Sequence, residues 1–254
     1  MLKHILPMIP PHRVYVEMFC GGAAVFFAKR PAEVEVINDT SDNLITFYRM
    51  LKTRPDELNL MIQGTLHAES DHRKAKYIWK NPKEYDDMAR AWALWVRVTM
   101  AYGSIEHGGY AVNAGKAPKK TSDYKNRVLR AIPRIEGAFI QSRDAVSLSL
   151  SYDTEESFYY VDPPYFNSDC GDYGGYSQGD FENLLEYLSK LKGKFLLSSY
   201  PSEPLAKAVE KYGWKYKEIK QTLAVDGRRK EKRTKTECLT WNYNYSGQPQ
   251  TLFT

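Results

Sequence analysis

The chain has 254 residues, which suits one large domain or one domain with an insertion, and its net charge of +5 permits a polyanionic partner without requiring one. Its three cysteines have no paired spacing and its five histidines have no metal spacing, which argues against a disulfide framework or a metal site and favours a reduced, cytoplasmic setting. The sequence has no apolar run of membrane-spanning length and no signal-peptide pattern, so no membrane segment is expected.

The first elements follow the pattern of a cofactor-binding strand-turn-helix unit. Residues 1–12 form a short apolar segment with some helical character, and residues 14–19 (VYVEMF) predict a strand. The small residues 20–24 (CGGAA) then predict a tight turn, and a helix is expected from Val25. Small residues in such a turn let a ligand approach the backbone, although an ordinary turn would look the same.

An acidic residue follows the second predicted strand. Residues 34–37 predict this strand, which ends at Asn38-Asp39, and Ser41 or Asp42 could cap a helix over residues 43–52. An acid about 20 positions after a glycine turn is well placed to bind ribose hydroxyls. Asp39 alone could equally be a helix cap, but together with the turn it favours the ribose interpretation.

From Thr53 to about Pro133 the pattern becomes mostly helical, polar and aromatic. The segment 86–101 predicts a helix with an apolar stripe, which is more typical of a core than of a base-stacking surface. The stripe consists of Met88, Trp92, Trp95, Val96 and Thr99. A glycine-rich loop over 102–110 follows, and then a basic segment that suits either phosphate contacts or a solvated face. The candidate DNA-binding residues there are Lys116, Lys119, Lys120 and Arg127.

The α/β alternation returns with a predicted strand over 138–142. Asp144 follows it, and could accept a hydrogen bond from a cofactor adenine or cap a short helix over 145–150. Residues 166–179 have no apolar period and are a candidate lid or a surface loop.

The last third predicts helices and strands that end in a hairpin. Helices are expected over 180–192, with Gly193 as the stop, and over 204–212, and a buried strand over 194–199. The closing strands, 215–225 and 236–243, are predicted to pair antiparallel. Their connection is strongly basic and either is solvated or contacts a phosphate backbone, with Arg228, Arg229 and Lys230 as the candidates.

The most specific motif is D-P-P-Y, at residues 162–165. Residues 158–161 are aromatic and β-branched, which predicts a buried strand, and Pro163 and Pro164 force it to end at Asp162. A carboxylate, a rigid carbonyl and the ring of Tyr165 are thereby presented at the carboxyl end of a strand, where open α/β sheets bind ligands. The plain alternative is a strand-end turn with a solvated aspartate.

These three groups suit methylation of an exocyclic amine on a base. The lone pair of such an amine is delocalised into the ring, so the nitrogen is a poor nucleophile. Asp162 and the Pro163 carbonyl could hold the amine hydrogens and aim the lone pair at a methyl group, while Tyr165 stacks on the base. This would be catalysis by orientation and preorganised electrostatics, with no covalent intermediate.

Four stretches together resemble a known family. Residues 14–25, 37–39, 162–165 and 236–242 (TECLTWN) resemble the Dam-like, D12-class DNA adenine-N6 methyltransferases of the alpha group, many of them phage-encoded. The resemblance covers most of the chain and is weakest between residues 54 and 135. It implies an α/β fold, a Rossmann-like class I methyltransferase sheet of seven strands with the last antiparallel, with a catalytic domain over 1–53 and 136–254 and a mostly helical target-recognition insertion over 54–135.

The resemblance also implies the chemistry and its residues. It implies S-adenosylmethionine as cofactor, no metal, double-stranded DNA as partner, a monomer or weak dimer, and action in the cytoplasm of a bacterium or phage-infected cell. The target adenine would be flipped out of the duplex, because N6 is unreachable in the stack. The cofactor residues would be Glu17, Phe19, Cys20, Gly21, Gly22, Asp39, Asp144 and Asp162, and the catalytic ones Asp162, Pro163, Pro164 and Tyr165.

The chain departs from the family pattern in three places. Met18 stands where the family usually has proline, and Ala23 where it has a third glycine. Relatives usually carry a Gly-Gly-Lys segment before the first strand, whereas this sequence begins at residues 1–3 (MLK), so we expect another segment to close the pocket or cofactor affinity to be reduced.

Two alternatives stay open. The same acceptors could hold an RNA adenine, a cytosine N4 amine or a glutamine amide, and a DNA-binding relative could have lost methylation altogether. Restriction-modification, phage self-protection and regulation are all compatible with the sequence.

Overall fold

The computed structural model describes residues 1–101, 109–111, 131–148, 150–167, 175–222 and 234–245. Its contacts divide the chain into two compact units, residues 1–40 with 143–254, and residues 41–142. Among the described residues, no helix has the length and apolar character needed to cross a membrane. The functional division with an insertion over 54–135 stays a proposal.

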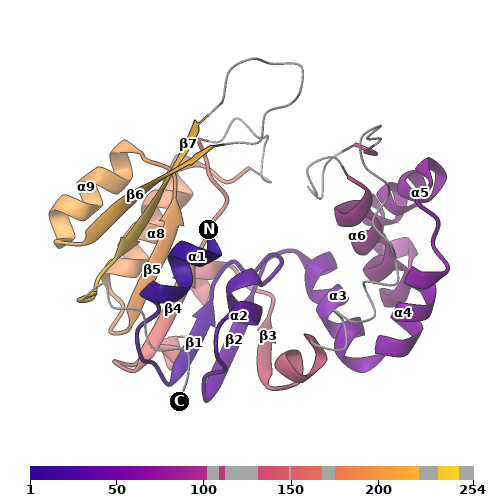
Figure 1. The fold of residues 1–254 in the computed structure, drawn as a ribbon, viewed down its shortest axis with the longest axis horizontal. Helices are drawn as coiled ribbons and strands as arrows, with labels where there is room; N and C mark the ends of the chain where they lie inside the picture. Colours follow the sequence, from indigo (N-terminus) through magenta and orange to yellow (C-terminus); the bar gives the residue numbers. More distant parts are fainter. Residues whose placement is uncertain (102–108, 112–130, 149, 168–174, 223–233, 246–254) are drawn as a thin grey trace. The chain divides into compact units, whose positions relative to one another are not determined.

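A seven-stranded sheet has the order β3-β2-β1-β4-β5-β7-β6 (Figure 1). β1 pairs parallel with β2 and β4, and β4 with β5, whereas β7 is antiparallel to both β5 and β6. The predicted α/β, Rossmann-like sheet of seven strands with the last antiparallel is therefore confirmed. The strands are β1 (Val14–Glu17), β2 (Val34–Asn38), β3 (Ala138–Gln141), β4 (Ser157–Val161), β5 (Lys194–Ser199), β6 (Lys215–Thr222) and β7 (Thr234–Trp241).

The central strands are covered on both faces. Every residue of β1 and β4 is buried, as expected for parallel strands with helices on either side. On one face, Val16, Tyr159 and Phe195 join a core with Phe181 of α8 (Gln178–Ser189) and Leu205 of α9 (Glu203–Tyr212). The Glu17 side chain of β1 points the other way and accepts from the Phe26 amide of α2 (Ala24–Ala28), and the short α1 (Leu2–Ile5) contacts both α2 and η1 (Leu6–Met8).

The strand register brings the carboxyl ends of β1, β2 and β4 to one edge. Glu17 lies opposite Ile37 of β2 and Tyr160 of β4. The segments that follow these strands, including the glycine turn, Asp39 and Asp162, therefore start from the same edge of the sheet.

Two predicted helices end differently in the structure. The segment 145–150 forms two 3₁₀ turns, η4 (Ala145–Ser147) and η5 (Leu150–Tyr152), because the backbone of Leu148 is extended. α8 ends at Ser189, before the predicted Lys192, because the Asp153 carboxylate accepts the amides of Lys192 and Gly193 outside the helix. The helix stop at Gly193 is thus wrong by a few residues.

The second unit contains a helical core. The described helices between residues 41 and 101 are α3 (Asp42–Thr53), α4 (Pro55–Gln63), α5 (Glu69–Lys80), η2 (Pro82–Glu84) and α6 (Asp87–Met100). Met88, Trp92, Trp95 and Val96 of α6 are all buried and Thr99, the last member of the predicted stripe, is half-buried, so the prediction of a core stripe is confirmed for its four apolar residues.

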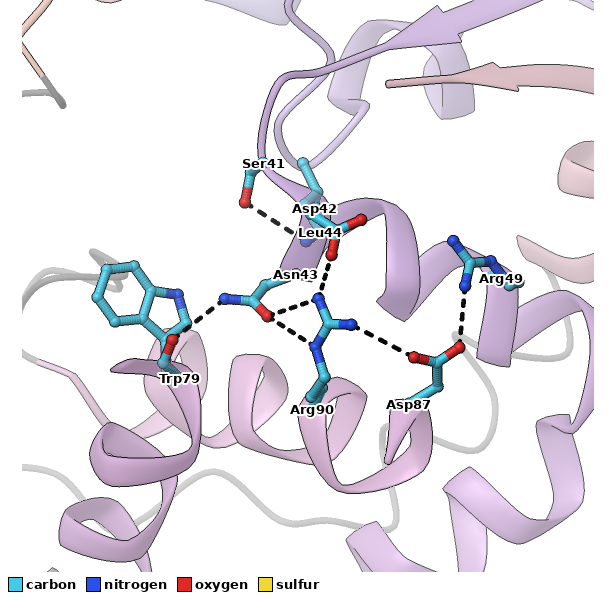
Figure 2. A network of polar contacts seen from close by, with 8 residues as sticks. All are labelled: Ser41, Asp42, Asn43, Leu44, Arg49, Trp79, Asp87 and Arg90. Carbon is cyan, nitrogen blue, oxygen red and sulfur yellow. Dashed lines mark hydrogen bonds and ion pairs between the residues drawn. The ribbon is translucent and has the colours of Figure 1, made fainter. Parts of the chain in front are cut away.

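A polar network centred on Arg90 of α6 links three helices of this unit (Figure 2). The Arg90 guanidinium donates to the Asn43 amide oxygen at 3.1 and 3.2 Å and to Asp87 at 3.3 Å, and it also pairs with Asp42. Asn43 donates in turn to the Trp79 carbonyl of α5 at 3.4 Å. With its side chain only 11% exposed, Arg90 fixes the start of α3 against α5 and α6.

Replacing Gly193 with Ala tests how closely β5 follows β4. A Cβ at Gly193 would lie 2.9 Å from the Ser157 carbonyl oxygen and 3.0 Å from Tyr159 Cε2. The variant should lose about 1–3 kcal/mol of unfolding free energy, the usual cost of overpacking, in urea denaturation. Gly137→Ala is the control, since its Cβ would meet nothing within 4 Å. Equal stability of the two variants would contradict the close approach.

Candidate active site

A cavity of about 730 Å³ opens at the carboxyl edge of the sheet. Its walls come from the segments after four strands: Phe19 and Gly21 after β1, Asp39 after β2, Asp162 after β4 and Tyr200 after β5. Residues distant in the sequence therefore share one cavity, because all four strands are parallel and end at the same edge.

A second recess of about 390 Å³ shares Phe19, Gly21 and Asp162 with this cavity. Asp162 thus lies where the two spaces meet. Each residue that the sequence suggested for cofactor binding lines one space or the other: Glu17, Cys20 and Gly22 the recess, Asp39 and Asp144 the cavity, and Phe19, Gly21 and Asp162 both. Pro163, Pro164 and Tyr165 also line the cavity.

Two tyrosine hydroxyls hold the Asp162 carboxylate. Tyr165 donates to Oδ1 at 2.8 Å and Tyr160 donates to Oδ2 at 3.2 Å. The Tyr165 hydroxyl also lies 3.1 Å from Ser198 Oγ on β5, which fixes its ring relative to the sheet.

Burial raises the pKa of Asp162 to about 6, although the hydrogen bonds from Tyr165 and Tyr160 act in the opposite direction. The side chain nevertheless keeps an exposed surface, because it faces the open cavity. Solvent that enters the open cavity therefore screens the carboxylate and limits the upward shift. At neutral pH the group is mostly ionised and accepts hydrogen bonds.

Glu17 is a buried carboxyl with a different balance. It is 2% exposed, and its Oε2 accepts from the Tyr15 hydroxyl at 2.7 Å and from the Phe26 amide at 3.0 Å. Burial raises its pKa to about 8, against the effect of these hydrogen bonds. Glu17 is therefore mostly protonated at neutral pH, and it anchors α2 as well as lining the recess.

Asp39 stabilises the glycine turn. The Gly21 amide donates to Asp39 Oδ2 at 2.9 Å, and Gly21 has a left-handed φ of +45°. Ala23 has a left-handed φ of +48°, which costs an alanine about 1–2 kcal/mol. Ser41, and not Asp39, caps α3 by accepting from the Leu44 amide, so the helix-cap alternative for Asp39 is wrong.

Asp144 does cap a turn. Its Oδ1 accepts from the Val146 amide at 3.0 Å at the start of η4, as the structural alternative predicted. It also lines the cavity.

Asn38, which had no predicted role, joins three segments. Its side-chain amide donates to the carbonyls of Met18 and Arg143, both at 2.9 Å, and accepts from the Arg143 amide at 3.0 Å. Asn38 is 1% exposed. An isolated asparagine at the end of an apolar strand was the only available signal.

A group of cavity residues opposite the glycine turn was also missed. The rings of Tyr165 and Tyr200 lie with centroids 4.3 Å apart, and Lys235 and Glu237 of β7 line the same cavity. Tyr160 was predicted only as part of a buried strand, and its hydrogen bond to Asp162 was not predicted. Glu237 lies in the family-like stretch 236–242 but had no assigned role.

Several predictions lie outside the described residues. These are the DNA-binding candidates Lys116, Lys119, Lys120, Arg127, Arg228, Arg229 and Lys230. Of the candidate lid over 166–179, only residues 166–167 and 175–179 are described. Within the described part of the chain, no group of three or more His, Cys, Asp or Glu residues could hold a metal ion.

Comparison with known proteins decides the family. The model of the D12 class N6 adenine-specific DNA methyltransferases matches residues 1–223. The chain belongs to this family. It is an adenine-specific DNA methyltransferase, and its substrate is DNA.

A curated relative agrees with this assignment. The Type II methyltransferase M1.LlaDCHI of Lactococcus lactis subsp. cremoris is 27% identical over 270 residues, which cover 96% of this chain and 91% of the relative. Among solved structures, a precorrin-6Y C5,15-methyltransferase from Geobacter metallireducens GS-15 has a TM-score of 0.42 at 9% identity, covering 94% of this chain and 84% of that one. A precorrin 8w decarboxylase from Methanobacterium thermoautotrophicum has a TM-score of 0.41 at 10% identity, covering 96% and 88%. Likeness at this level carries no argument about the reaction.

Replacing Asp162 with Asn tests the raised pKa. A carboxyl whose pKa is about 6 in the folded protein, against a value near 4 in an unfolded chain, destabilises the fold once it ionises. In urea denaturation at pH 8, the free energy of unfolding of the variant should exceed that of the native protein by roughly 1 kcal/mol, a value reduced by solvent screening in the cavity. The difference should shrink as the pH falls through 6 towards 4.

The control is Glu155→Gln, which changes an exposed carboxylate. Its stability difference measures how far the loss of an exposed carboxylate by itself changes the result over the same pH range. A flat difference for Asp162→Asn would mean that the Asp162 pKa is not raised.

Proposed function

We propose that this methyltransferase transfers the methyl group of S-adenosylmethionine to N6 of a flipped-out adenine at specific sites in double-stranded DNA. The observation that carries the proposal is the position of Asp162, where a recess beside the glycine turn meets a cavity with an aromatic wall. A group that holds an amine acceptor against a methyl donor must contact both ligands.

The recess and the adjoining end of the cavity fit the cofactor. A Cβ at Gly21 or Gly22 would meet nothing within 4 Å, so the turn has open space that a ligand can fill. Asp39 would hold the ribose hydroxyls and Asp144 the adenine, while Glu17, Cys20 and Phe19 would line the amino-acid end. When bound, the sulfonium group supplies an electrophilic methyl.

Asp162 and the Pro163 carbonyl would hold the amine of the target base. Each Asp162 oxygen accepts one tyrosine hydroxyl, which leaves capacity for a further hydrogen bond from the amine. As N6 took up the methyl group and the bond from the methyl carbon to sulfur broke, positive charge would develop on N6, and the ionised Asp162 would stabilise it. N6 would then release a proton to solvent water in the open cavity, and the sulfur would leave as the neutral thioether of S-adenosylhomocysteine. Pro164 keeps this turn rigid, and Tyr165 is fixed so that its ring face can stack on the base.

The family supports DNA adenine over the other amine substrates. An inactive DNA-binding relative is disfavoured, because binding alone does not require a carboxylate held by two tyrosine hydroxyls beside the cavity. We further propose that residues 54–135 recognise the target, with Lys116, Lys119, Lys120 and Arg127, together with Arg228, Arg229 and Lys230, contacting phosphates. The Type II relative favours a role in restriction-modification. A monomer or weak dimer acting in the cytoplasm remains part of the proposal.

Methyl incorporation with an Asp162→Ala variant tests the reaction. Purified protein is incubated with labelled S-adenosylmethionine and unmethylated genomic DNA, and the modified nucleoside is identified by mass spectrometry. We expect N6-methyladenine from the native protein and from the exposed-site control Glu155→Ala, and a loss of at least a thousand-fold in Asp162→Ala, because charge stabilisation and orientation are lost together. Near-normal turnover in Asp162→Ala would remove it from the mechanism.

Calorimetric titration with S-adenosylhomocysteine tests the role of Asp39. Asp39→Ala should weaken binding about ten-fold or more, since hydrogen bonds to a charged acceptor are lost. Asp39→Asn keeps an acceptor for the Gly21 amide, so it separates damage to the turn from loss of a ribose contact. Asp56→Ala, an exposed site on α4, should bind normally. Unchanged affinity in Asp39→Ala would exclude the ribose role.

A further inference from the structure

Lys235 and Glu237 of β7 present two charged side chains to the cavity. The same cavity is lined by Asp162 and Tyr165, the residues proposed to hold the target base. They are two residues apart on one strand and therefore point to the same side of the sheet. β7 runs antiparallel to β5, with Ser199 opposite Cys238, so the start of β7 lies beside the carboxyl end of β5. This register brings a cation to the edge where Asp162 and Tyr165 lie.

Lys235 is held above the aromatic wall. Its Nζ lies 4.5 Å from the ring centroid of Tyr200 and 5.5 Å from that of Tyr165, and 3.0 Å from Glu237 Oε1. Burial opposes the charge on Lys235, but hydrogen bonds to Tyr200 and Glu237 outweigh it and raise the pKa of the ammonium. Lys235 is therefore a cationic donor at neutral pH.

Glu237 forms a largely buried ion pair with Lys235. It is only 6% exposed, and its Oε2 has no hydrogen-bond partner among the described residues. A carboxylate buried in this way is unfavourable unless a cation is held against it. Glu237 consequently restricts where the Lys235 ammonium can go, and both side chains line the cavity together with Asp162.

The chemistry of adenine provides an acceptor next to its amine. N6 is flanked by N1 on one side and by N7 on the other, and both ring nitrogens carry a lone pair in the plane of the ring. When acceptors hold the amine, a donor beside them meets one of these nitrogens in either orientation of the base. Lys235 is a donor in that place.

We propose that Lys235 donates a hydrogen bond to a ring nitrogen flanking the amine of the target adenine, and that Glu237 is the positioning residue that aims the ammonium. This inference rests on the proposed function and adds a second point of base recognition to Asp162. Tyr165 would then stack on the base, while the rings of Tyr165 and Tyr200 both contact the ammonium that bonds to the base.

Base analogues test the contact without knowledge of the target site. Long DNA of mixed sequence is made by primer extension with dATP, 7-deaza-dATP or 1-deaza-dATP, and kcat/KM for methyl transfer is measured on each. The kcat/KM of the native enzyme should be about ten-fold or more lower on the analogue that lacks the contacted nitrogen than on ordinary DNA. This is the usual effect of losing one hydrogen bond from a charged donor. Lys235→Met, which keeps an apolar chain over the tyrosines, should lose most of this discrimination.

Two variants separate positioning from general damage. Glu237→Gln keeps the size of the side chain but not its charge, and it should reduce the analogue discrimination in the same direction as Lys235→Met. A merely structural role for Glu237 would lower the melting temperature and leave the analogue ratio unchanged. Lys220→Met removes an exposed lysine from the neighbouring β6 and should keep the native ratio.

The outcomes distinguish this inference from the proposed function. If the native enzyme methylates ordinary DNA and all variants show the same analogue ratios, the Lys235 contact is overturned and the proposed function stands. If the native enzyme transfers no methyl group to adenine, both are overturned.

Discussion

The site depends on one buried side chain, the amide of Asn38. It bonds to the backbone carbonyl of Met18 and to both the carbonyl and the amide of Arg143, so the segments after β1 and β3 are fixed to the end of β2. Parallel strands bring their carboxyl ends to one edge but leave the following loops undetermined. The three hydrogen bonds of Asn38 remove that freedom, because a buried amide without its partners costs several kcal/mol. Asp39 and Asp144 occupy their places beside the cavity as a result.

Two carboxyl groups near each other have opposite states at neutral pH. Glu17 and Asp162 both line the smaller recess, and repulsion between them contributes to the raised pKa of Glu17. Deeper burial leaves Glu17 protonated, with a pKa of about 8, while two phenol hydroxyls and access to solvent keep Asp162 ionised above a pKa of about 6. Environment thereby divides the roles: one group is neutral and structural, and the other is charged and faces the ligand space.

The parts of the site that could be predicted from the sequence are those encoded locally. Pro163 and Pro164 end a strand wherever they occur, and small residues after a strand leave room for a ligand, so the motif and the turn were recognisable. Lys235 and Glu237 could not be found in this way, because they reach the cavity only through the β5–β7 register, which is a long-range property. The end of α8 was misjudged for a similar reason: Asp153, distant in the sequence, takes the amides beyond Ser189.

The left-handed Ala23 has a consequence for the entropy of binding. A glycine at that position would visit many backbone conformations, whereas an alanine at φ +48° is held against its own preference by the surrounding hydrogen bonds. The turn is therefore rigid before any ligand arrives, and its strain is already balanced by the free energy of folding. A ligand that enters such a turn loses little affinity to ordering the loop. Alanine in place of glycine therefore means that the conformational entropy of the turn is lost when the protein folds and not when the ligand binds.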